Sequence, residues 1–284
     1  MRTERLRDVT PVDGVAHYVH TELIMGLPIT IVVTDSGDAP GRGRTIAWPG
    51  QSTHEREQEM AEAAAETFDY FREVDEQFSP FKESSEVSRI NRGELSEAEY
   101  SPEMKRVLRL CDQTKRETHG YFDPWWKGRF DPSGLVKGLA AYDAASILKR
   151  RGFENFCIEA GGDIEVRGRN AGRHKWRIGI RNPFNPDTIV KTVVLENAGI
   201  ATSGLYIRGE HIYNPITGKN AKEIASFTVI GPNVYEADRL ATAAFAMGKG
   251  GLDLIASFPG FDAYMVEYSG VATYTDGFLR YVTL

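Results

Sequence analysis

The chain has 284 residues, 41% of them hydrophobic, which is enough for one large domain with a buried core. Its formal net charge of −6 argues against nucleic acid or an anionic membrane as its partner. The first residues carry charge without an apolar run, and no stretch is long and apolar enough to span a membrane, so we expect a cytoplasmic protein. Cys111 and Cys157 each fall within an expected helix or strand, and we favour two buried thiols over one long-range disulfide.

The beginning of the chain predicts a tail followed by paired strands. Residues 1–17 are expected to form the tail, and residues 18–284 a single domain. Residues 18–34 read as a strand, a kink at 25–28 and a second strand over 29–33.

Two helices are expected next. Residues 35–54 are rich in Gly, Pro and Arg and predict a loop. Apolar residues then recur at helical spacing, which predicts a core-packing helix over residues 55–78. We expect residues 79–91 to form a loop that ends in a short apolar turn, and residues 102–118 to form the second helix.

A phosphate-binding arrangement is predicted in the middle of the chain. The loop FDPSG, at residues 130–134, runs directly into a helix that carries Lys137 and ends at Gly152. The unpaired N–H groups at the start of such a helix point at whatever precedes it, and this arrangement binds phosphate well. Lys137 adds positive charge one turn in, and Asp131 supplies a carboxylate at the mouth. We therefore expect a site for a phosphate-bearing ligand here.

Strands dominate the remainder of the chain. They are expected over residues 156–160, 176–181, 188–196, 200–203, 211–213, 226–230 and 263–268. Two helices, over 235–247 and 252–258, interrupt them, and Asp276-Gly277 predicts a hairpin. Since helices lie mainly in the first half and strands in the second, we expect the α+β class, with helices packed on mixed or antiparallel sheets.

Asp238 and Thr242 are candidate metal ligands. They stand four residues apart on an expected helix, so their side chains share one face, and both offer hard oxygen atoms of the kind that Mg²⁺ prefers. In the alternative reading, Asp238 only stabilises the first turn of that helix through its dipole, and Thr242 packs.

Two other features also allow two readings. His211 precedes the turn sequence NPITG and is either catalytic or structural. The pair Trp125-Trp126 either stacks on a planar ligand or packs in the core, and we favour packing. The absence of GxGxxG after a strand, GxxxxGK[ST], HExxH, CxxC and GxSxG argues against dinucleotide dehydrogenases, P-loop NTPases, zinc proteases and serine hydrolases.

Eight blocks of sequence, in order, resemble the ApbE family, the FAD:protein FMN transferases, from about residue 25 to the C-terminus. The blocks are MGLPITI (25–31), SPFKESSEVSRIN (79–91), HGYFDP (119–124), FDPSGLVKGLAAYDAASIL (130–148), IEAGGDIEVRG (158–168), ATSGLYIR (201–208), HIYNPITG (211–218) and ADRLATAAFAMG (237–248). Each block alone is weak evidence, but eight in register are strong. The resemblance implies a single ApbE-like domain related to the T-fold.

The resemblance also implies a reaction. Members of this family bind FAD, use Mg²⁺ to cleave its pyrophosphate, transfer the FMN half to a Ser or Thr hydroxyl of an acceptor protein and release AMP. FAD is thus the implied substrate and Mg²⁺ the implied cofactor, with Mn²⁺ as the alternative metal. The implied partner is a flavin-acceptor protein, the FMN-binding domain of a redox protein.

Matching positions imply the roles of individual residues. The implied FAD contacts are Met25, Phe81, Gly120, Tyr121, Phe122, Asp131, Lys137 and Ile212. The implied metal ligands are the carbonyl of Gly134 and the side chains of Asp238 and Thr242. His211 matches the histidine proposed in the family to remove the acceptor proton, a contribution of roughly 10²–10⁴-fold.

One position departs from the family pattern. Asn214 stands where the family usually has Asp. If that carboxylate supports His211, its loss slows transfer; if it only caps the turn, Asn serves equally well. Three readings therefore remain: an FMN transferase, an FAD pyrophosphatase that releases FMN and AMP, and a non-enzymatic FAD-binding protein.

Overall fold

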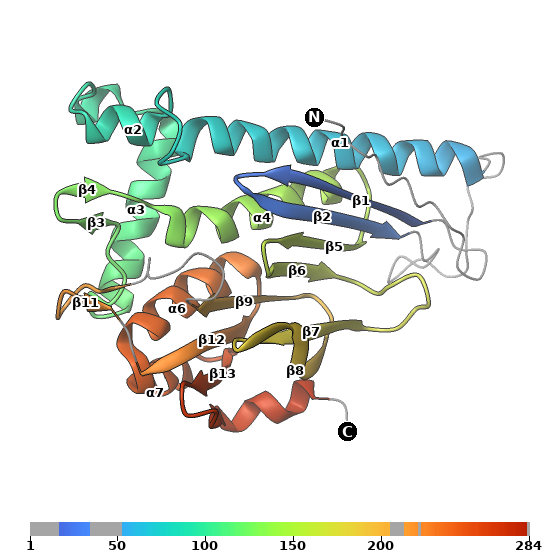
Figure 1. Cartoon of the computed structure of the whole chain (residues 1–284). Coiled ribbons are helices and arrows are strands. Elements are labelled where there is room, and N and C mark those ends of the chain that lie inside the picture. The colour runs from blue at the N-terminus through green and yellow to red at the C-terminus, as the bar shows by residue number, and fades with distance from the viewer. Residues whose placement is uncertain (1–16, 35–52, 205–212, 221–222, 283–284) are drawn as a thin grey trace.

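An eight-stranded antiparallel sheet forms the centre of the domain (Figure 1). The computed structural model describes residues 17–34, 53–204, 213–220 and 223–282. In spatial order the strands are β1 (His17–Ile24), β2 (Leu27–Thr34), β5 (Asn155–Ala160), β6 (Asp163–Arg167), β9 (Ala198–Gly204), β12 (Ile224–Gly231), β13 (Asp262–Glu267) and β14 (Ala272–Tyr274). Each neighbouring pair runs antiparallel.

Helices and three small hairpins surround this sheet. The α-helices are α1 (Thr53–Phe78), α2 (Glu86–Asn91), α3 (Pro102–Glu117), α4 (Ser133–Arg150), α6 (Val234–Met247) and α7 (Gly251–Ala256), with 3₁₀ turns at Glu97–Glu99, Gly248–Gly250 and Asp276–Tyr281. The hairpins pair β3 (Trp125–Trp126) with β4 (Arg129–Phe130), β7 (Trp176–Asn182) with β8 (Asn185–Leu195), and β10 (Tyr213–Asn214) with β11 (Lys219–Asn220).

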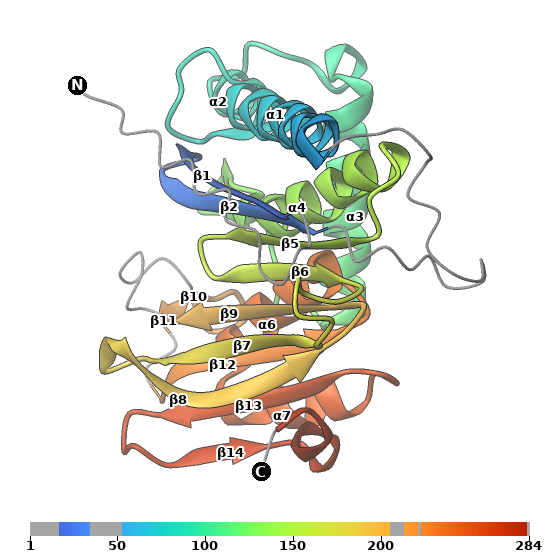
Figure 2. The same cartoon turned by 90° about the vertical axis from the view of Figure 1, so that its right-hand side faces the viewer.

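Alternation along the strands gives the sheet two apolar faces. On one face, side chains such as Ile31 and Ile158 pack with α1 and α4, while Phe227 and its neighbours on β12 pack with α6 and α7. On the other face, Val166 and Ile200 belong to a separate core that includes the β7–β8 hairpin (Figure 2). Each fully buried apolar side chain of this size contributes about 1.5–3 kcal/mol. The fold is therefore α+β, as expected, with helices on one side and a hairpin on the other.

The predicted turn and helices of the first half are confirmed. Met25 and Gly26 both have positive φ, 57° and 71°, which makes the expected kink a two-residue hairpin turn between β1 and β2. Helix α1 begins two residues before the predicted start, so the last two residues of the expected 35–54 loop belong to it. Cys111 and Cys157 are both buried free thiols.

One local prediction was wrong. Asp276-Gly277 does not turn a hairpin; it begins a 3₁₀ helix, and a Cβ at Gly277 would lie only 2.4 Å from Asp262 Oδ1. Glycine is needed there for close packing, and the real hairpin joins β13 to β14 with Gly270 in its turn. The short apolar turn expected at the end of residues 79–91 is α2, which buries Val87 and Ile90 and is capped by Ser85, whose Oγ accepts a hydrogen bond from Ser88 N at 3.0 Å.

Some predictions cannot be compared with the fold. The tail up to residue 16, the loop over 35–52, His211 and Ile212 lie outside the described residues. Among the helices that the structure does describe, none has the length and apolar character needed to cross a membrane.

Candidate active site

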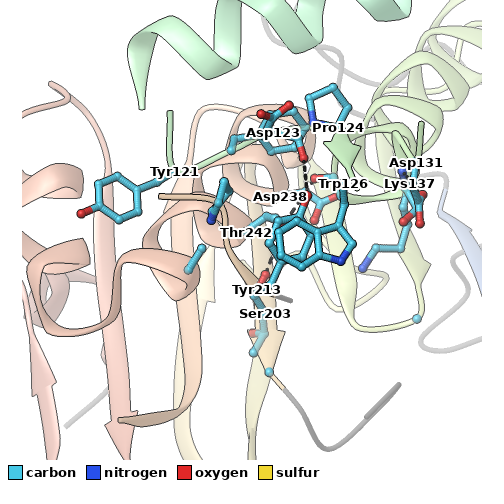
Figure 3. A pocket seen from close by; sticks show the side chains of 18 of the residues that line it. Tyr121, Asp123, Pro124, Trp126, Asp131, Lys137, Ser203, Tyr213, Asp238 and Thr242 are labelled. Carbon is cyan, nitrogen blue, oxygen red and sulfur yellow. Dashed lines mark hydrogen bonds between the residues drawn. The ribbon is translucent and has the colours of Figure 1, made fainter. Parts of the chain in front are cut away.

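A cavity of about 390 Å³ opens where α4 begins, next to the middle of α6 (Figure 3). Its lining comes from the start of β2, the segment after α3, the two short hairpins, the start of α4, the β5–β6 turn, the end of β9 and one face of α6. The residues are Leu27, Tyr121, Phe122, Asp123, Pro124, Trp126, Arg129, Asp131, Ser133, Gly134, Lys137, Gly161, Thr202, Ser203, Gly204, Tyr213, Pro215, Asp238, Thr242 and Ala246.

The start of α4 faces this cavity, as the sequence predicts. Asp131 Oδ1 accepts a hydrogen bond from Ser133 N at 3.0 Å, which fixes the loop as it enters the helix. Ser133, Gly134 and Lys137 all line the cavity. The first N–H groups of the helix lack intrahelical acceptors, so the helix presents positive potential to an anionic ligand.

Helix α6 supplies the opposite wall and is fixed at its start by two acceptors. Asn233 Oδ1 accepts from Glu236 N at 2.9 Å, and Glu165 Oε2 accepts from Val234 N at 2.7 Å. These contacts position the helix end on which Asp238 stands.

Two contacts join α6 to α4. Asp238 Oδ2 accepts a hydrogen bond from Gly138 N at 2.8 Å, and Thr242 Oγ1 donates to the carbonyl of Gly134 at 3.2 Å. Gly134, Asp238 and Thr242, which the family resemblance implied as metal ligands, all line the cavity beside this contact between the two helices.

Two carboxylates and one ammonium group share the floor of the site. Asp163 and Asp238 are almost fully buried, and Lys137 pairs with Asp163. Asp163 Oδ1 also accepts from Thr202 N at 3.3 Å. Burial, reinforced by the charge of Asp163 and opposed by Lys137, raises the pKa of Asp238 above its ordinary value. A second cation at this place would offset the repulsion between the two carboxylates.

The donor set fits a hard divalent cation. A carbonyl, a hydroxyl and a carboxylate are the oxygen ligands that Mg²⁺ takes, and Ser203 Oγ adds a further oxygen 3.5 Å from Thr242 Oγ1. Within the described residues, no three His, Cys, Asp or Glu side chains gather as a metal site. A cation held here would need ligand oxygens to complete its coordination, as Mg²⁺ commonly does with phosphates.

Only some of the other residues predicted to contact FAD line the cavity. Tyr121, Phe122 and Asp131 line the cavity. Gly120, Met25 and Phe81 do not: Gly120 lies beside Ile216, and Met25 stands two residues before the lining residue Leu27. Phe81 is 91% exposed and lines a neighbouring depression that shares Arg129 with the cavity.

The sequence did not predict that a stacked aromatic pair lines the cavity. Trp126 stacks on Tyr213 with ring centroids 3.7 Å apart, and both line the cavity. Tyr213 Oη donates to the carbonyl of Asp123 at 3.2 Å, which holds the β10–β11 hairpin against the segment after α3. Core packing, the reading we favoured for both tryptophans, is wrong: Trp126 lines the cavity and Trp125 is 44% exposed. Asp163 was also missed as a site residue, although the motif GGD was the available signal.

The model of the ApbE family matches residues 25–129 and 125–265, a range that contains every residue lining the cavity. This chain belongs to the ApbE family.

Two curated relatives of this ApbE-family chain are named FAD:protein FMN transferase. The protein from Salmonella typhimurium is 29% identical over 150 residues, which is 49% of this chain and 43% of that protein. The protein from Vibrio cholerae is 33% identical over 129 residues, 42% of this chain and 39% of its own length. The matched stretches thus span less than half the length of these curated relatives.

Solved ApbE structures have the same fold. The ApbE protein of Thermotoga maritima superposes with a TM-score of 0.77 at 22% identity, over 94% of this chain and 100% of that one. The flavin transferase ApbE of Vibrio cholerae gives a TM-score of 0.75 at 21% identity, with the same coverage of both chains.

Proposed function

We propose that this protein is an FAD:protein FMN transferase that depends on Mg²⁺, with Mn²⁺ as the alternative metal. It would transfer the FMN moiety of FAD to a Ser or Thr hydroxyl of an acceptor, the FMN-binding domain of a redox protein. The hydroxyl oxygen forms a bond to the FMN phosphorus, the bond from that phosphorus to the bridging oxygen breaks, and AMP leaves.

One observation carries the proposal: a single cavity combines a helix start and Lys137 with the oxygen atoms of Gly134, Asp238 and Thr242. The first two features suit a pyrophosphate, and the three oxygens suit the cation that accompanies it. Family membership supports the same reading. Phosphoryl transfer needs positioning and charge neutralisation more than covalent help, and this cavity is built for both.

Different residues of the chain would have different roles in this reaction. The start of α4 and Lys137 would bind and orient the pyrophosphate, while Gly134, Asp238 and Thr242 would hold Mg²⁺. When bound, Mg²⁺ would neutralise charge on the pyrophosphate and on the departing AMP. The proton released by the acceptor hydroxyl would pass to His211, which lies outside the described residues.

Aromatic side chains would hold the planar rings of FAD. Trp126, Tyr213 and Tyr121 line one cavity with the pyrophosphate site. Phe81, in the neighbouring depression across Arg129, would contact a flavin ring that extends out of the cavity.

AMP release from FAD tests the proposal against its two alternatives. Chromatography should show AMP only when FAD, Mg²⁺ and an FMN-binding acceptor domain are all present, and EDTA should abolish it. Equal AMP release with and without the acceptor would indicate an FAD pyrophosphatase. Bound FAD without any AMP would indicate a non-enzymatic FAD-binding protein.

A further inference from the structure

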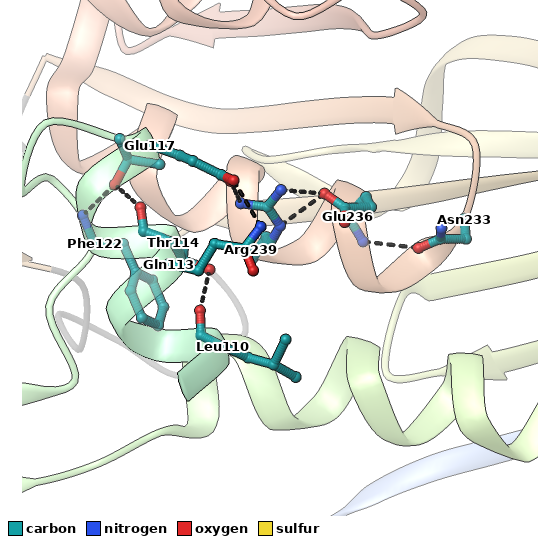
Figure 4. Close-up of polar contacts among 9 residues, drawn as sticks. Leu110, Gln113, Thr114, Glu117, Phe122, Asn233, Glu236 and Arg239 are labelled. Carbon is teal, nitrogen blue, oxygen red and sulfur yellow. Dashed lines mark hydrogen bonds and ion pairs between the residues drawn. The ribbon is translucent and has the colours of Figure 1, made fainter. Parts of the chain in front are cut away.

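Arg239, the residue after Asp238 on α6, is a buried cation outside the cavity (Figure 4). Its side chain is 5% exposed and contacts two carboxylates. Nη1 donates at 2.6 Å to Glu117, the last residue of α3, and Nε donates at 2.7 Å to Glu236, one turn earlier on α6. Neither Arg239 nor Glu117 lines the cavity, and the reaction described above assigns neither of them a contact with the ligand.

The two neighbours on α6 hold the helix from different sides. Successive residues of an α-helix lie about 100° apart around its axis. Asp238 contacts the backbone of Gly138 on α4, whereas Arg239 contacts Glu117 on α3. Because these two contacts lie on different sides of α6, together they fix the rotation of the helix about its own axis. That rotation sets the directions in which Asp238 and Thr242 point.

The α3 anchor is itself connected to the cavity wall. Gln113 Nε2 donates to Glu117 Oε1 at 2.7 Å, which holds that carboxylate on the last turn of α3. Thr118, the next residue, accepts a hydrogen bond from Phe122 N at 3.1 Å and donates to the carbonyl of Thr114 at 2.7 Å (Figure 4). The ion pair thus ties α6 to the same helix end from which the lining segment 121–126 departs.

Stability alone is a weak reason to bury such an ion pair. Removing charges from water costs about as much as their attraction returns, and apolar replacements of similar volume are often neutral or stabilising. The planar guanidinium of Arg239 also has a fixed geometry, with separate nitrogen atoms directed at carboxylates on two helices.

We propose that the Arg239–Glu117 ion pair is a positioning device for the divalent cation. It would orient Asp238 and Thr242 towards the carbonyl of Gly134 without touching the ligand. The inference rests on the proposed function, because it assumes that these three residues hold a cation.

Binding of Mn²⁺ in the presence of saturating ADP tests this inference separately from catalysis. ADP supplies a pyrophosphate but no FMN, and Mn²⁺ binding is followed by electron paramagnetic resonance. The variants are Arg239→Met, which keeps an unbranched apolar stem and removes the charge, and Glu117→Gln, which keeps the shape of the side chain. The control is Arg106→Met, which breaks the ion pair of Arg106 on α3 with Asp143 on α4; this pair is 2.5 Å between Nη1 and Oδ2 and lies away from the cavity.

Both variants should bind Mn²⁺ at least about tenfold more weakly, the range seen when residues that support metal ligands are replaced. The control should bind it like the parent. Should Arg239→Met fail to fold, Glu117→Gln decides alone, and parent-like Mn²⁺ binding by Glu117→Gln overturns the inference. A parent protein that binds no Mn²⁺ overturns it as well. A parent that binds Mn²⁺ with ADP but releases no AMP from FAD even when Mg²⁺ and the acceptor domain are present contradicts the proposed function instead, and the variants still test the positioning.

Discussion

The backbone N–H of Gly138 donates a 2.8 Å hydrogen bond to Asp238 Oδ2 across the contact between α4 and α6. A Cβ at residue 138 would lie 2.6 Å from Asp238 Cβ and 2.9 Å from the carbonyl oxygen of Val234. Glycine therefore lets the two helices approach closely, and this approach brings Asp238 and Gly134 to the same cavity.

Gly138→Ala should destabilise the protein by about 1–3 kcal/mol, because the added methyl group forces α4 and α6 apart. Urea unfolding measures the change. The control is Gly250→Ala, whose Cβ would lie 3.4 Å from the side chain of Met247 and should cost no more than about 0.5 kcal/mol. Equal stability of both variants would mean that the helices do not meet at Gly138.

Lys137→Met and Phe81→Ala should each weaken FAD binding by about 1–3 kcal/mol, the scale of a lost charge-assisted hydrogen bond or aromatic stack. Fluorescence titration with FAD, without divalent cation, measures both. Lys249→Met, which removes an exposed lysine paired with Glu267 away from the cavity, is the control for a lost positive charge. Parent-like FAD binding by Phe81→Ala would mean that the flavin stays within the cavity.

Glu165→Gln should change how stability depends on pH. Burial, opposed by Arg167 and by Val234 N–H, raises the pKa of Glu165 from 4.5 to about 7. The folded protein therefore keeps a proton that the unfolded chain loses as pH rises through this window, and stability falls. Relative to the variant, the parent should lose about 1.4 kcal/mol for each unit of raised pKa.

Urea unfolding of parent and variant at both ends of that window tests this difference. A constant difference in their free energies of unfolding would show that Glu165 does not titrate there.

Asn214→Asp should leave the transfer rate unchanged. Asn214 Oδ1 accepts hydrogen bonds from Ile216 N at 2.9 Å and Thr217 N at 3.0 Å, so the side chain serves the turn between β10 and β11. An aspartate would make both contacts equally well. A faster rate with a shifted pH profile would favour the other reading, in which a carboxylate at this position supports His211.

Local patterns in the sequence predicted the parts of the site that lie within one helix. Helical spacing placed Asp238 and Thr242 on one face of α6. The FDPSG loop placed Lys137 one turn into α4. The grouping of Asp238 and Thr242 with Gly134 came from the family resemblance, because a contact between residues 134 and 242 leaves no periodic signal in the sequence.

The features that the sequence did not predict share one physical origin, which is contact between segments far apart in the chain. The stack of Trp126 on Tyr213 joins two short hairpins that are far apart in the sequence. The pairing of Asp163 with Lys137 likewise joins β6 to α4. Asp276-Gly277 has the composition of a hairpin turn, but its contact with Asp262 on another strand decides its conformation. Tertiary contact overrides local turn chemistry at that position.

Intact-mass spectrometry of an FMN-binding acceptor domain tests the central claim most directly. The acceptor is incubated with FAD, Mg²⁺ and either the parent protein or Asp238→Asn. With the parent, the acceptor should gain the mass of FMN less one water, and one AMP should appear for each adduct. Asp238→Asn should lower the rate by about 10²-fold or more, since it removes a charged group that would help to hold the cation. Release of AMP with no change in the mass of the acceptor would contradict transfer.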